Sequence, residues 1–345
     1  MRVDVILSPE CSPGEVTELG LLAERHGIGA VWTSNYPSSR DPFISLCPLA
    51  IASSRIRLGP LVITPYEMHP YKTAKALASL NELCGGRANI LIGGPTGVNA
   101  AMGMGVTRMV GRVRECVEIL KSVRADRALN YNGKIFQVWG YRPSWATDAP
   151  PLIYVGANKP QMLRMAAQVA DNIMLGDPTP EVLANAMTTL DRELQSAGRR
   201  RQDLRISALV AWHVKADRHR SVAEARQQLA LRGMLDPWYL RAFLSEEECH
   251  FVDTHREAFF AAYKKNTPVI DGVPDSITDK LVEHLSCTGD EGDIDRHIGR
   301  LKRFRDLGLT EVALKLHHDQ AEAIRQIGER VVPALQASAG PLSRG

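Results

Sequence analysis

The strongest constraint in this sequence is a regular alternation of short apolar segments with longer segments of helical periodicity. Strands that are each followed by a helix must pair in parallel, because only a crossover returns the chain to the same end of a sheet. Eight such units close into an α/β barrel, the (β/α)8 or TIM fold, whose ligand site lies at the carboxyl ends of the strands. The expected strands are residues 3–8, 30–33, 56–63, 87–94, 151–156, 172–176, 204–214 and 311–316.

The connection between the seventh and eighth expected strands is too long for a simple barrel turn. Residues 221–286 carry several helical patterns and little strand signal, so we expect a helical insertion that caps the mouth of the barrel. Residues 1–337 then form a single barrel domain, and residues 338–345 form a loose tail. Residues 129–138 predict a small hairpin around Asn132-Gly133.

The rival fold is an open, doubly wound sheet. A dinucleotide site in that fold needs Gly-x-Gly-x-x-Gly after the first strand, and residues 8–12 read Ser-Pro-Glu-Cys-Ser instead. The sequence also lacks Gly-x-x-x-x-Gly-Lys-Ser/Thr, so P-loop chemistry is not expected. Both absences favour the barrel.

Charge and cysteine content exclude several classes of protein. Lys and Arg number 42 against 39 Asp and Glu, and the densest basic run, Arg199-Arg200-Arg201, stands beside Gly198 in an expected turn, so we expect no nucleic-acid partner. The six cysteines are far apart without Cys-x-x-Cys, which argues against zinc and disulfides and fits a reducing cytoplasm. No run approaches the ~18 apolar residues of a membrane span, and residues 1–4 read as a strand and not as a signal peptide.

The residues just after each strand decide function in a barrel. Glycines follow the fourth, fifth and sixth expected strands, where they let a flat or charged ligand approach the backbone. Residues 156–159 come directly before a helix that starts at Pro160, so free N–H groups and the cation of Lys159 there predict an anion or phosphate seat. The candidate strand-end residues are Ser34, Asn35, Tyr36, Thr64, Tyr66, His69, Gly93, Gly94, Thr96, Gly156, Ala157, Asn158, Lys159, Gly176, Asp177, Trp212, His213, His317 and His318.

The third expected strand breaks at Thr64-Pro65, and Pro70 precedes a helix expected at residues 72–83. Proline fixes φ and removes a donor, so this strand must end in a stiff, shaped loop.

Metal chemistry is disfavoured at these strand ends. His317 and His318 are adjacent and point to opposite sides of a strand, so they cannot both bind one ion on regular backbone. His213 lies within an expected strand and is interpreted as a packed residue. Paired carboxylates for glycoside hydrolysis are also missing. A site rich in glycine, hydroxyls and apolar walls suits a planar cofactor that performs the chemistry itself.

Four stretches carry a family resemblance: residues 62–70, 80–87, 111–120 and 153–175. Together they resemble the bacterial luciferase-like superfamily, in the branch that uses the deazaflavin coenzyme F-420 and includes methylenetetrahydromethanopterin reductase and F-420-dependent glucose-6-phosphate dehydrogenase. The resemblance implies a barrel with an insertion near its mouth and a non-proline cis peptide at Leu61-Val62, under the cofactor ring. The cofactor contacts that it implies come from Leu61, Val62, Thr64, Gly93, Gly94, Leu175 and Gly176 for the ring, and from Gly156, Ala157 and Asn158 for the phosphate-bearing tail.

One position departs from the family pattern. Many relatives carry Asp-His after the second strand for proton transfer, and this chain has Asn35-Tyr36. Asn does not act as an acid or base at neutral pH, and Tyr ionises only near pH ~10. We therefore treat Asn35, Tyr36 and His69 as the candidate catalytic residues, with Tyr36 or His69 as donor, unless the substrate needs no proton from the enzyme.

The resulting hypothesis is an F-420-dependent oxidoreductase that moves hydride between the deazaflavin and a small organic substrate. The alternative is a monooxygenase that uses reduced FMN from a separate reductase. A third reading is a barrel that has lost its cofactor and acts as a binding protein. The resemblance also implies a homodimer formed through helices beside the second and third strands.

Overall fold

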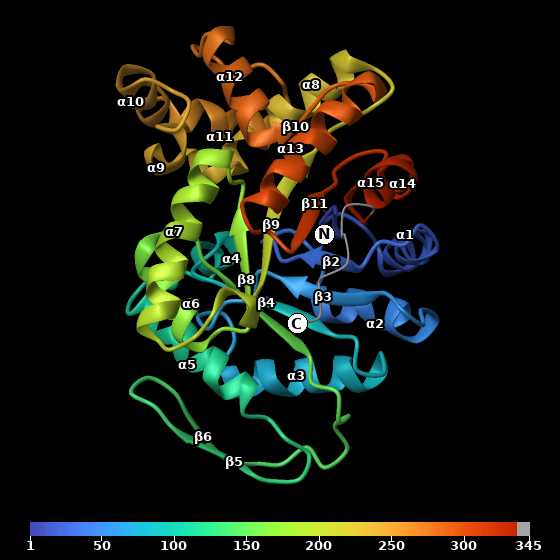
Figure 1. The fold of residues 1–345 in the computed structure, drawn as a ribbon, viewed down its shortest axis with the longest axis vertical. Helices are drawn as coiled ribbons and strands as arrows, with labels where there is room; N and C mark the ends of the chain where they lie inside the picture. The colour runs from blue at the N-terminus through green and yellow to red at the C-terminus, as the bar shows by residue number, and fades with distance from the viewer. Residues whose placement is uncertain (337–345) are drawn as a thin grey trace, which may run out of the picture.

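The computed structural model describes residues 1–336 and forms an eight-stranded parallel barrel (Figure 1). The strands follow the order β3-β2-β1-β11-β9-β8-β7-β4. Parallel bridges from Leu58 to Ala88 and from Ile63 to Ile92 then join β3 to β4 and close the ring. The barrel strands are β1 (Arg2–Leu7), β2 (Ala30–Ser34), β3 (Arg57–Leu61), β4 (Asn89–Ile92), β7 (Leu152–Gly156), β8 (Asn172–Gly176), β9 (Arg205–Trp212) and β11 (Glu311–Lys315). The predicted fold class is confirmed.

Helices surround the strands, and five of them begin at a proline. Proline lacks an N–H and has a helical φ, so it suits the first position of a helix and fixes where the preceding loop ends. The barrel helices are α1 (Pro13–Arg25), α2 (Pro42–Ala52), α3 (Pro70–Leu83), α4 (Gly97–Ala101), α5 (Met109–Lys121), α6 (Pro160–Val169), α7 (Pro180–Ser196), α13 (Ile294–Asp306), α14 (Gln320–Gln326) and α15 (Val332–Gln336).

Strand side chains divide into two layers, because alternate residues point to opposite faces. One set packs against the surrounding helices in a large outer core. The other set fills the inside of the barrel, so its interior is a packed core and not a pore. The inner cluster consists of Ile6, Ala30, Trp32, Leu61, Leu91, Tyr154, Met174 and Ala313.

The amino end of the barrel is closed by a polar cluster, which we call the amino-end network. It consists of Arg2, Asp4, Tyr154, Glu311 and the exposed Arg205, which lies 3.6 Å from Glu311. Arg2 pairs with Asp4 at 2.9 Å and with Glu311 at 3.0 Å. Tyr154 donates its hydroxyl hydrogen to Glu311 at 2.7 Å. Burial raises the pKa of both carboxyl groups, and the charge of Arg2 opposes that effect. Charges at this end therefore neutralise one another.

An insertion between β9 and β11 packs around its own hydrophobic cluster at one end of the molecule (Figure 1). Its members include Leu235, Leu240, Val252, Phe259 and Leu281. The elements are α8 (Arg218–Gln227), two 3-10 turns (Leu229–Leu231 and Gly233–Leu235), α9 (Pro237–Leu240), α10 (Glu246–Thr254), α11 (Arg256–Lys265) and α12 (Asp275–Leu285). Helices thus occupy the stretch where the sequence predicted them.

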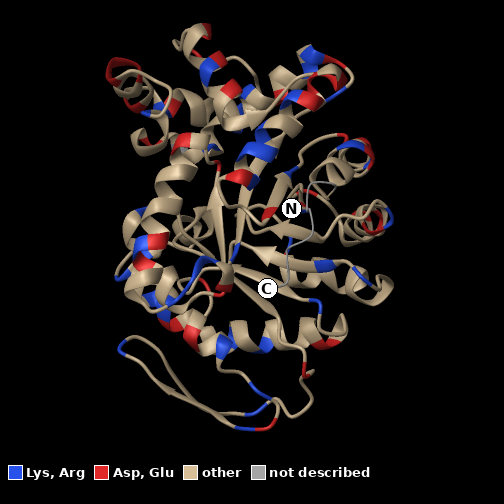
Figure 2. Cartoon of the chain, in the orientation of Figure 1, with Lys and Arg blue, Asp and Glu red and all other residues tan. Residues whose placement is uncertain are grey.

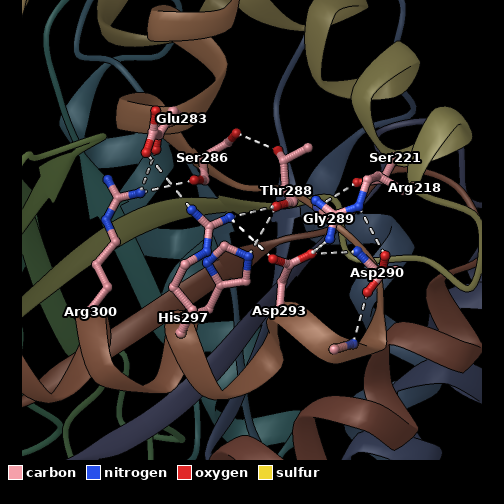
Figure 3. A network of polar contacts seen from close by, with 12 residues as sticks. Arg218, Ser221, Glu283, Ser286, Thr288, Gly289, Asp290, Asp293, His297 and Arg300 are labelled. Carbon is pink, nitrogen blue, oxygen red and sulfur yellow. Dashed lines mark hydrogen bonds and ion pairs between the residues drawn. The ribbon is translucent and has the colours of Figure 1, made fainter.

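The chain returns from the insertion through a short strand and a polar joint. Strand β10 (Ser286–Cys287) pairs in parallel with the end of β9. Figure 3 shows the joint beyond it, where the Gly289 N–H donates to the Ser221 hydroxyl at 2.8 Å. The carboxylate of Asp293 accepts from the Asp290 N–H at 3.0 Å and pairs with Arg218 at 2.5 Å. These contacts tie α8 to the start of α13.

A separate hairpin, β5 (Leu129–Asn132) and β6 (Gln137–Tyr141), lies beside α3 and α5 (Figure 1). The carboxylate of Glu115 accepts the backbone N–H groups of Lys134, Ile135 and Phe136 at 2.9, 3.0 and 2.8 Å. The hairpin predicted around Asn132-Gly133 is present and slightly longer than expected.

Several predicted boundaries shift by a few residues. Strand β3 ends at Leu61 and not at residue 63, and β9 ends at Trp212, so His213 follows the strand. Helix α3 starts at Pro70 because the ring of His69 caps it, accepting the Tyr71 N–H at 3.1 Å. The predicted tail, residues 338–345, lies outside the described residues. Among residues 1–336, no helix is long and apolar enough to cross a membrane.

Surface charges of both signs are interspersed over the helices (Figure 2). The basic run is matched by local carboxylates: Arg201 pairs with Asp191, and Arg200 pairs with Asp203 at 3.3 Å. Arg199 reaches Asp171 at 3.6 Å. This arrangement fits the interpretation of the run as a solvated corner.

Candidate cofactor and substrate site

A cavity of about 320 Å³ opens at the carboxyl ends of β4, β7 and β8, under the insertion. Four residues that the family resemblance assigned to the cofactor line it together: Gly94, Gly156, Asn158 and Gly176. The remaining lining residues are Met109, Lys159, Met162, Asp177, Leu231, Gly233, Asp236 and Tyr239. The residues come from strand ends far apart in sequence, as expected for a barrel site.

The end of the cavity beside β7 carries the predicted phosphate seat. Helix α6 starts there, and its N-cap residue, Lys159, makes no side-chain cap bond. Helix N-terminal N–H groups attract anions. Two details of the prediction were wrong. The Ala157 N–H is not free, because it donates to the Met174 carbonyl at 3.2 Å. The ammonium of Lys159 is not free either, because it pairs with Asp236 of the insertion at 2.6 Å.

Asn158 links the two strand ends at this seat. Its side-chain oxygen accepts the Gly176 N–H at 2.7 Å. A Cβ on Gly176 would lie 3.7 Å from the Asn158 amide, and a Cβ on Gly156 would lie 3.7 Å from the Gly93 backbone. Both glycines therefore leave space in the cavity and are not required by close packing, which fits a surface that a ligand approaches.

The peptide bond between Leu61 and Val62 is cis, as the resemblance implied. Leu61 belongs to the inner cluster of the barrel, and Val62 packs against that cluster. Asn35 holds this bulge: its N–H donates to the Leu61 carbonyl at 2.7 Å, and its side-chain amide donates to the Val62 carbonyl at 3.2 Å. The bulge is thereby presented at the mouth.

Glu67 completes the support of the bulge, and sequence reasoning did not single it out. Its carboxylate accepts the Asn35 amide at 3.0 Å and the Thr64 N–H at 2.8 Å. Burial raises the pKa of Glu67, and these two donors oppose the shift. The amide hydrogens of Asn35 are therefore engaged in holding the loop, and its catalytic role stays a prediction.

The two glycines after β4 have different surroundings. A Cβ on Gly93 would come within 2.5 Å of Val62 Cγ1, so the bulge itself requires glycine at this position. A Cβ on Gly94 would meet the flexible Met109 sulfur at 2.9 Å, and Gly94 lines the cavity. Gly93 thus has a packing reason that is independent of any ligand.

Thr64 does not line the cavity. Its side chain is fully buried, and its hydroxyl exchanges hydrogen bonds with the Asn99 amide at 3.1 and 3.3 Å. The same hydroxyl accepts the N–H groups of Tyr66 and Glu67, each at 3.3 Å. The contact of Thr64 with the cofactor ring stays a prediction.

The ring contact of Leu175 stays a prediction, and its side chain does not line the cavity. It belongs to the outer core between strands and helices, whereas its neighbour Met174 belongs to the inner cluster. Side chains alternate along a strand, so the residues of β8 that face the inside are Met174 and Gly176.

His69 is exposed at the start of α3, away from the other candidates. Its ring caps the helix and packs edge-on against Phe136 of the hairpin segment, with centroids 5.2 Å apart. Within residues 1–336, His69 forms no hydrogen bond or ring pair with Asn35 or Tyr36, so its role as donor stays a prediction.

Tyr36 lies at the mouth, beside a lysine that sequence reasoning missed. Lys315 of β11 has its Nζ 5.9 Å from the centre of the Tyr36 ring. Burial raises the pKa of Tyr36, with the charge of Arg232 opposing it. Burial also lowers the pKa of Lys315 to about 7. The available signal was a lysine at the carboxyl end of β11, two residues after the inward-facing Ala313.

The insertion is fastened over this mouth by a buried ion pair. Asp177 follows β8 with φ of 43° and pairs with Arg232 at 3.0 Å. Its second oxygen accepts the Gly233 N–H at 3.0 Å. Burial raises the pKa of Asp177, and Arg232 opposes the shift. The pair joins a strand end directly to the roof of the cavity.

Histidines at the mouth pack against one another. His213 and His317 stack with centroids 5.0 Å apart, and His213 Nδ1 lies 2.8 Å from a Glu224 carboxylate oxygen. Burial lowers the pKa of both imidazoles. Within residues 1–336, no group of three His, Cys, Asp or Glu side chains is arranged to hold a metal ion.

A second cavity, of about 740 Å³, lies at the opposite end of the barrel. Leu152, Asn172 and Arg205, the first residues of β7, β8 and β9, line it. Although this cavity is larger, residues at the amino ends of barrel strands serve stability, so we do not place the chemistry there.

The chain is a closed parallel barrel with a glycine-lined cavity at its strand ends. Its full-length relatives are a reductase and a dehydrogenase, so the chain is an oxidoreductase of the barrel class. The chain belongs to the luciferase-like monooxygenase family, whose model matches residues 1–311.

Full-length relatives agree with this placement. The chain is 29% identical over 341 residues to the 5,10-methylenetetrahydromethanopterin reductase of Archaeoglobus fulgidus, covering 97% of this chain and 100% of that protein. It is 25% identical over 352 residues to the F-420-dependent glucose-6-phosphate dehydrogenase of Microbacterium testaceum, covering 95% of each. The coenzyme F-420 dependent tetrahydromethanopterin reductase structure from Methanopyrus kandleri shares the fold with a TM-score of 0.78 at 20% identity, over 96% of this chain and 98% of that one.

Proposed function

We propose that this chain is a coenzyme F-420-dependent oxidoreductase that transfers hydride between the deazaflavin and a small organic substrate. The observation that carries the proposal is the cavity at the ends of β4, β7 and β8. It gathers Gly94, Gly156, Asn158 and Gly176, which the family pattern assigns to ring and tail, beside an uncapped helix N-terminus. Two relatives that match over nearly their whole length are named 5,10-methylenetetrahydromethanopterin reductase and F-420-dependent glucose-6-phosphate dehydrogenase.

The residues of the chain fit such a cofactor. The N-terminus of α6, with Gly156 and Asn158, would hold the phosphate-bearing tail. Val62 and Gly94 would border the ring. When bound, the deazaflavin supplies or accepts hydride at its C5 atom.

The protein contributes alignment and exclusion of water. Asn35 and Glu67 fix the bulge beneath the ring position. The Asp177–Arg232 pair holds the insertion over the mouth. In this proposal, neither of these two pairs exchanges a proton with the substrate. The protein therefore accelerates the reaction mainly by positioning the cofactor and the substrate.

We also propose that the chain is a homodimer through α2. The outward face of this helix is apolar: Ile44 is 67% exposed and Ile51 is 71% exposed, with Pro48 and Ala52 between and beside them. Continuous exposed apolar patches mark interaction surfaces. A second copy of the same helix would cover this face in a symmetric contact.

The proposed function is tested by mixing the protein anaerobically with oxidised F-420, reduced F-420 and reduced FMN, and measuring binding by fluorescence. We expect one F-420 per chain and weaker binding of FMN. Tight binding of reduced FMN, followed by oxygen consumption once air is admitted, would instead mark the flavin monooxygenase. Binding of neither cofactor would leave a barrel that acts as a binding protein and would overturn the proposal.

A further inference from the structure

Lys315 is a buried cation without a counter-charge. Its side chain is 2% exposed, on the inner face of β11. Its Nζ donates to the Leu7 carbonyl at 2.7 Å and to the Ser34 hydroxyl at 2.8 Å, and both acceptors are neutral. Among the described residues, no carboxylate pairs with it, although buried charges in proteins are ordinarily paired.

Other cations near the mouth differ from Lys315 in this respect. Arg232 is paired with Asp177 at 3.0 Å. Lys215 is paired with Glu224 at 3.0 Å and with Asp319 at 3.3 Å. Of these three cations, Lys315 is the one without a carboxylate partner.

Unpartnered polar atoms accompany this charge. An ammonium has three hydrogens, and Lys315 uses two. Within the described part of the chain, the buried Nε2 atoms of His213 and His317 and the Nε of Arg232 have no hydrogen-bond partner. His317 is two residues beyond Lys315, and burial together with the charges of His213, Lys315 and Arg232 lowers the pKa of its imidazole.

We propose that the substrate carries a carboxylate group and that the ammonium of Lys315 binds it, with His317 and Arg232 beside it. This inference rests on the proposed function, because it places the substrate in the mouth next to the cofactor. One unpaired positive charge matches the single charge of a carboxylate better than the ~1.5 to 2 charges of a phosphate at neutral pH.

This anion position is separate from the seat for the cofactor tail. The tail seat lies at the ends of β7 and β8, whereas Lys315 contacts the ends of β1 and β2. In the strand order, β9 and β11 separate β8 from β1. Tyr36, whose ring lies 5.9 Å from Lys315 Nζ, would form the wall between carboxylate and solvent.

Titration of Lys315 gives the proposal a measurable signature. Because its pKa in the folded protein is about 7, the ammonium is present below pH 7 and is lost above it. Charged or titratable groups around it are Arg232, Cys11, Tyr36 and His317. Burial raises the pKa of Cys11 and of Tyr36 and lowers the pKa of His317, so each of these shifts moves titration away from the range between pH 7 and 9.

The test measures acetate binding to the whole chain by calorimetry at pH 6, 7, 8 and 9. We expect the acetate Kd of the wild type to be nearly constant up to pH 7 and to rise by about tenfold for each pH unit above it, because only the ammonium binds. Lys315→Met, which keeps the length of the side chain, should bind acetate at least ~10-fold more weakly at pH 6 and show no pH dependence.

Lys159→Met is the matched control, since it removes a lysine from the tail seat; its acetate Kd should follow the wild type. Inorganic phosphate is the second probe. If Lys159→Met weakens phosphate binding and Lys315→Met does not, the phosphate is bound at the tail seat. Acetate binding without dependence on pH or on Lys315 would overturn the carboxylate site. Circular dichroism confirms that each variant is folded. Binding of F-420, measured in parallel, is expected to be unchanged in Lys315→Met, so a failure of cofactor binding in the wild type is recognised separately.

Discussion

The two ends of this barrel treat buried charge in opposite ways, and strand β11 shows both. At the amino end, Glu311 is paired with Arg2 at 3.0 Å and accepts from Tyr154. Four residues later, at the carboxyl end, Lys315 is equally buried and has only neutral acceptors. We interpret the paired charges at the amino end as groups that stabilise the fold. We interpret the unpaired Lys315 at the carboxyl end as a group that binds a ligand.

The two cavities also lie at opposite ends of the barrel. The larger one borders the amino ends of the strands. The smaller one joins the carboxyl ends of strands, an uncapped helix and the roof of the insertion. The volume of a cavity is therefore a poorer guide to the site than its position on the barrel.

The largest expected effect comes from breaking the amino-end network with Arg2→Met. The change leaves Asp4 and Glu311 buried without their cation, so we expect a loss of about 3–5 kcal/mol in the free energy of unfolding, measured with urea. Lys280→Met, which breaks an exposed pair with Glu248, is the control and should cost at most ~1 kcal/mol. A loss below ~1 kcal/mol for Arg2→Met would show that the network is not essential to stability.

The next effect is the pH dependence of stability caused by Lys315. Its pKa falls from 10.5 to about 7 on folding, so the unfolded chain binds more protons between these values and stability rises with pH there. The cost of the buried charge is thus fully present below pH 7 and relieved towards pH 10. Between pH 6 and 10, the stability of wild type relative to Lys315→Met should rise by roughly 2–4 kcal/mol. A difference that does not change with pH would mean that Lys315 is not a buried, unpaired cation.

At the mouth, Gly156→Val should block the seat for the cofactor tail. The first added carbon meets other atoms at an ordinary 3.7 Å, so the fold tolerates it while the branched side chain fills the cavity. We expect the Kd of F-420 to rise at least ~100-fold with little change in melting temperature. Gly299→Val, on α13 where an added carbon has no neighbour within 4 Å, should bind F-420 like the wild type. If Gly156→Val bound F-420 as tightly as the wild type, the cofactor tail would have to bind at another position.

The smallest effect on folding is expected on the surface, from Ile51→Lys. The charge would face a second copy of α2, so sedimentation should show a monomer while the free energy of unfolding stays within ~0.5 kcal/mol. Val269→Lys, at a similarly exposed apolar position on the insertion, should leave the assembly unchanged. If Ile51→Lys were still a dimer, α2 would not be part of the dimer interface.

The fold could be predicted because its signals are local: apolar runs, helical spacing, and prolines where helices begin. The bulge and the glycines of the cavity followed from the family pattern. Contacts between residues far apart in the chain could not be predicted. The Thr64 hydroxyl is taken by Asn99, 35 residues away. The unpaired state of Lys315 depends on Leu7 and Ser34, about 300 residues away. The outward direction of Leu175 follows from the alternation along β8, and its ring contact stays a prediction.

The most direct test of the central claim is a crystal structure of the chain with oxidised F-420. The account predicts the ring against Val62 and Gly94, and the phosphate at the N-terminus of α6 between Gly156 and Asn158. It also predicts that Lys315 stays free of the cofactor. A tail bound in the cavity at the amino ends of the strands, or a phosphate bound on Lys315, would contradict it.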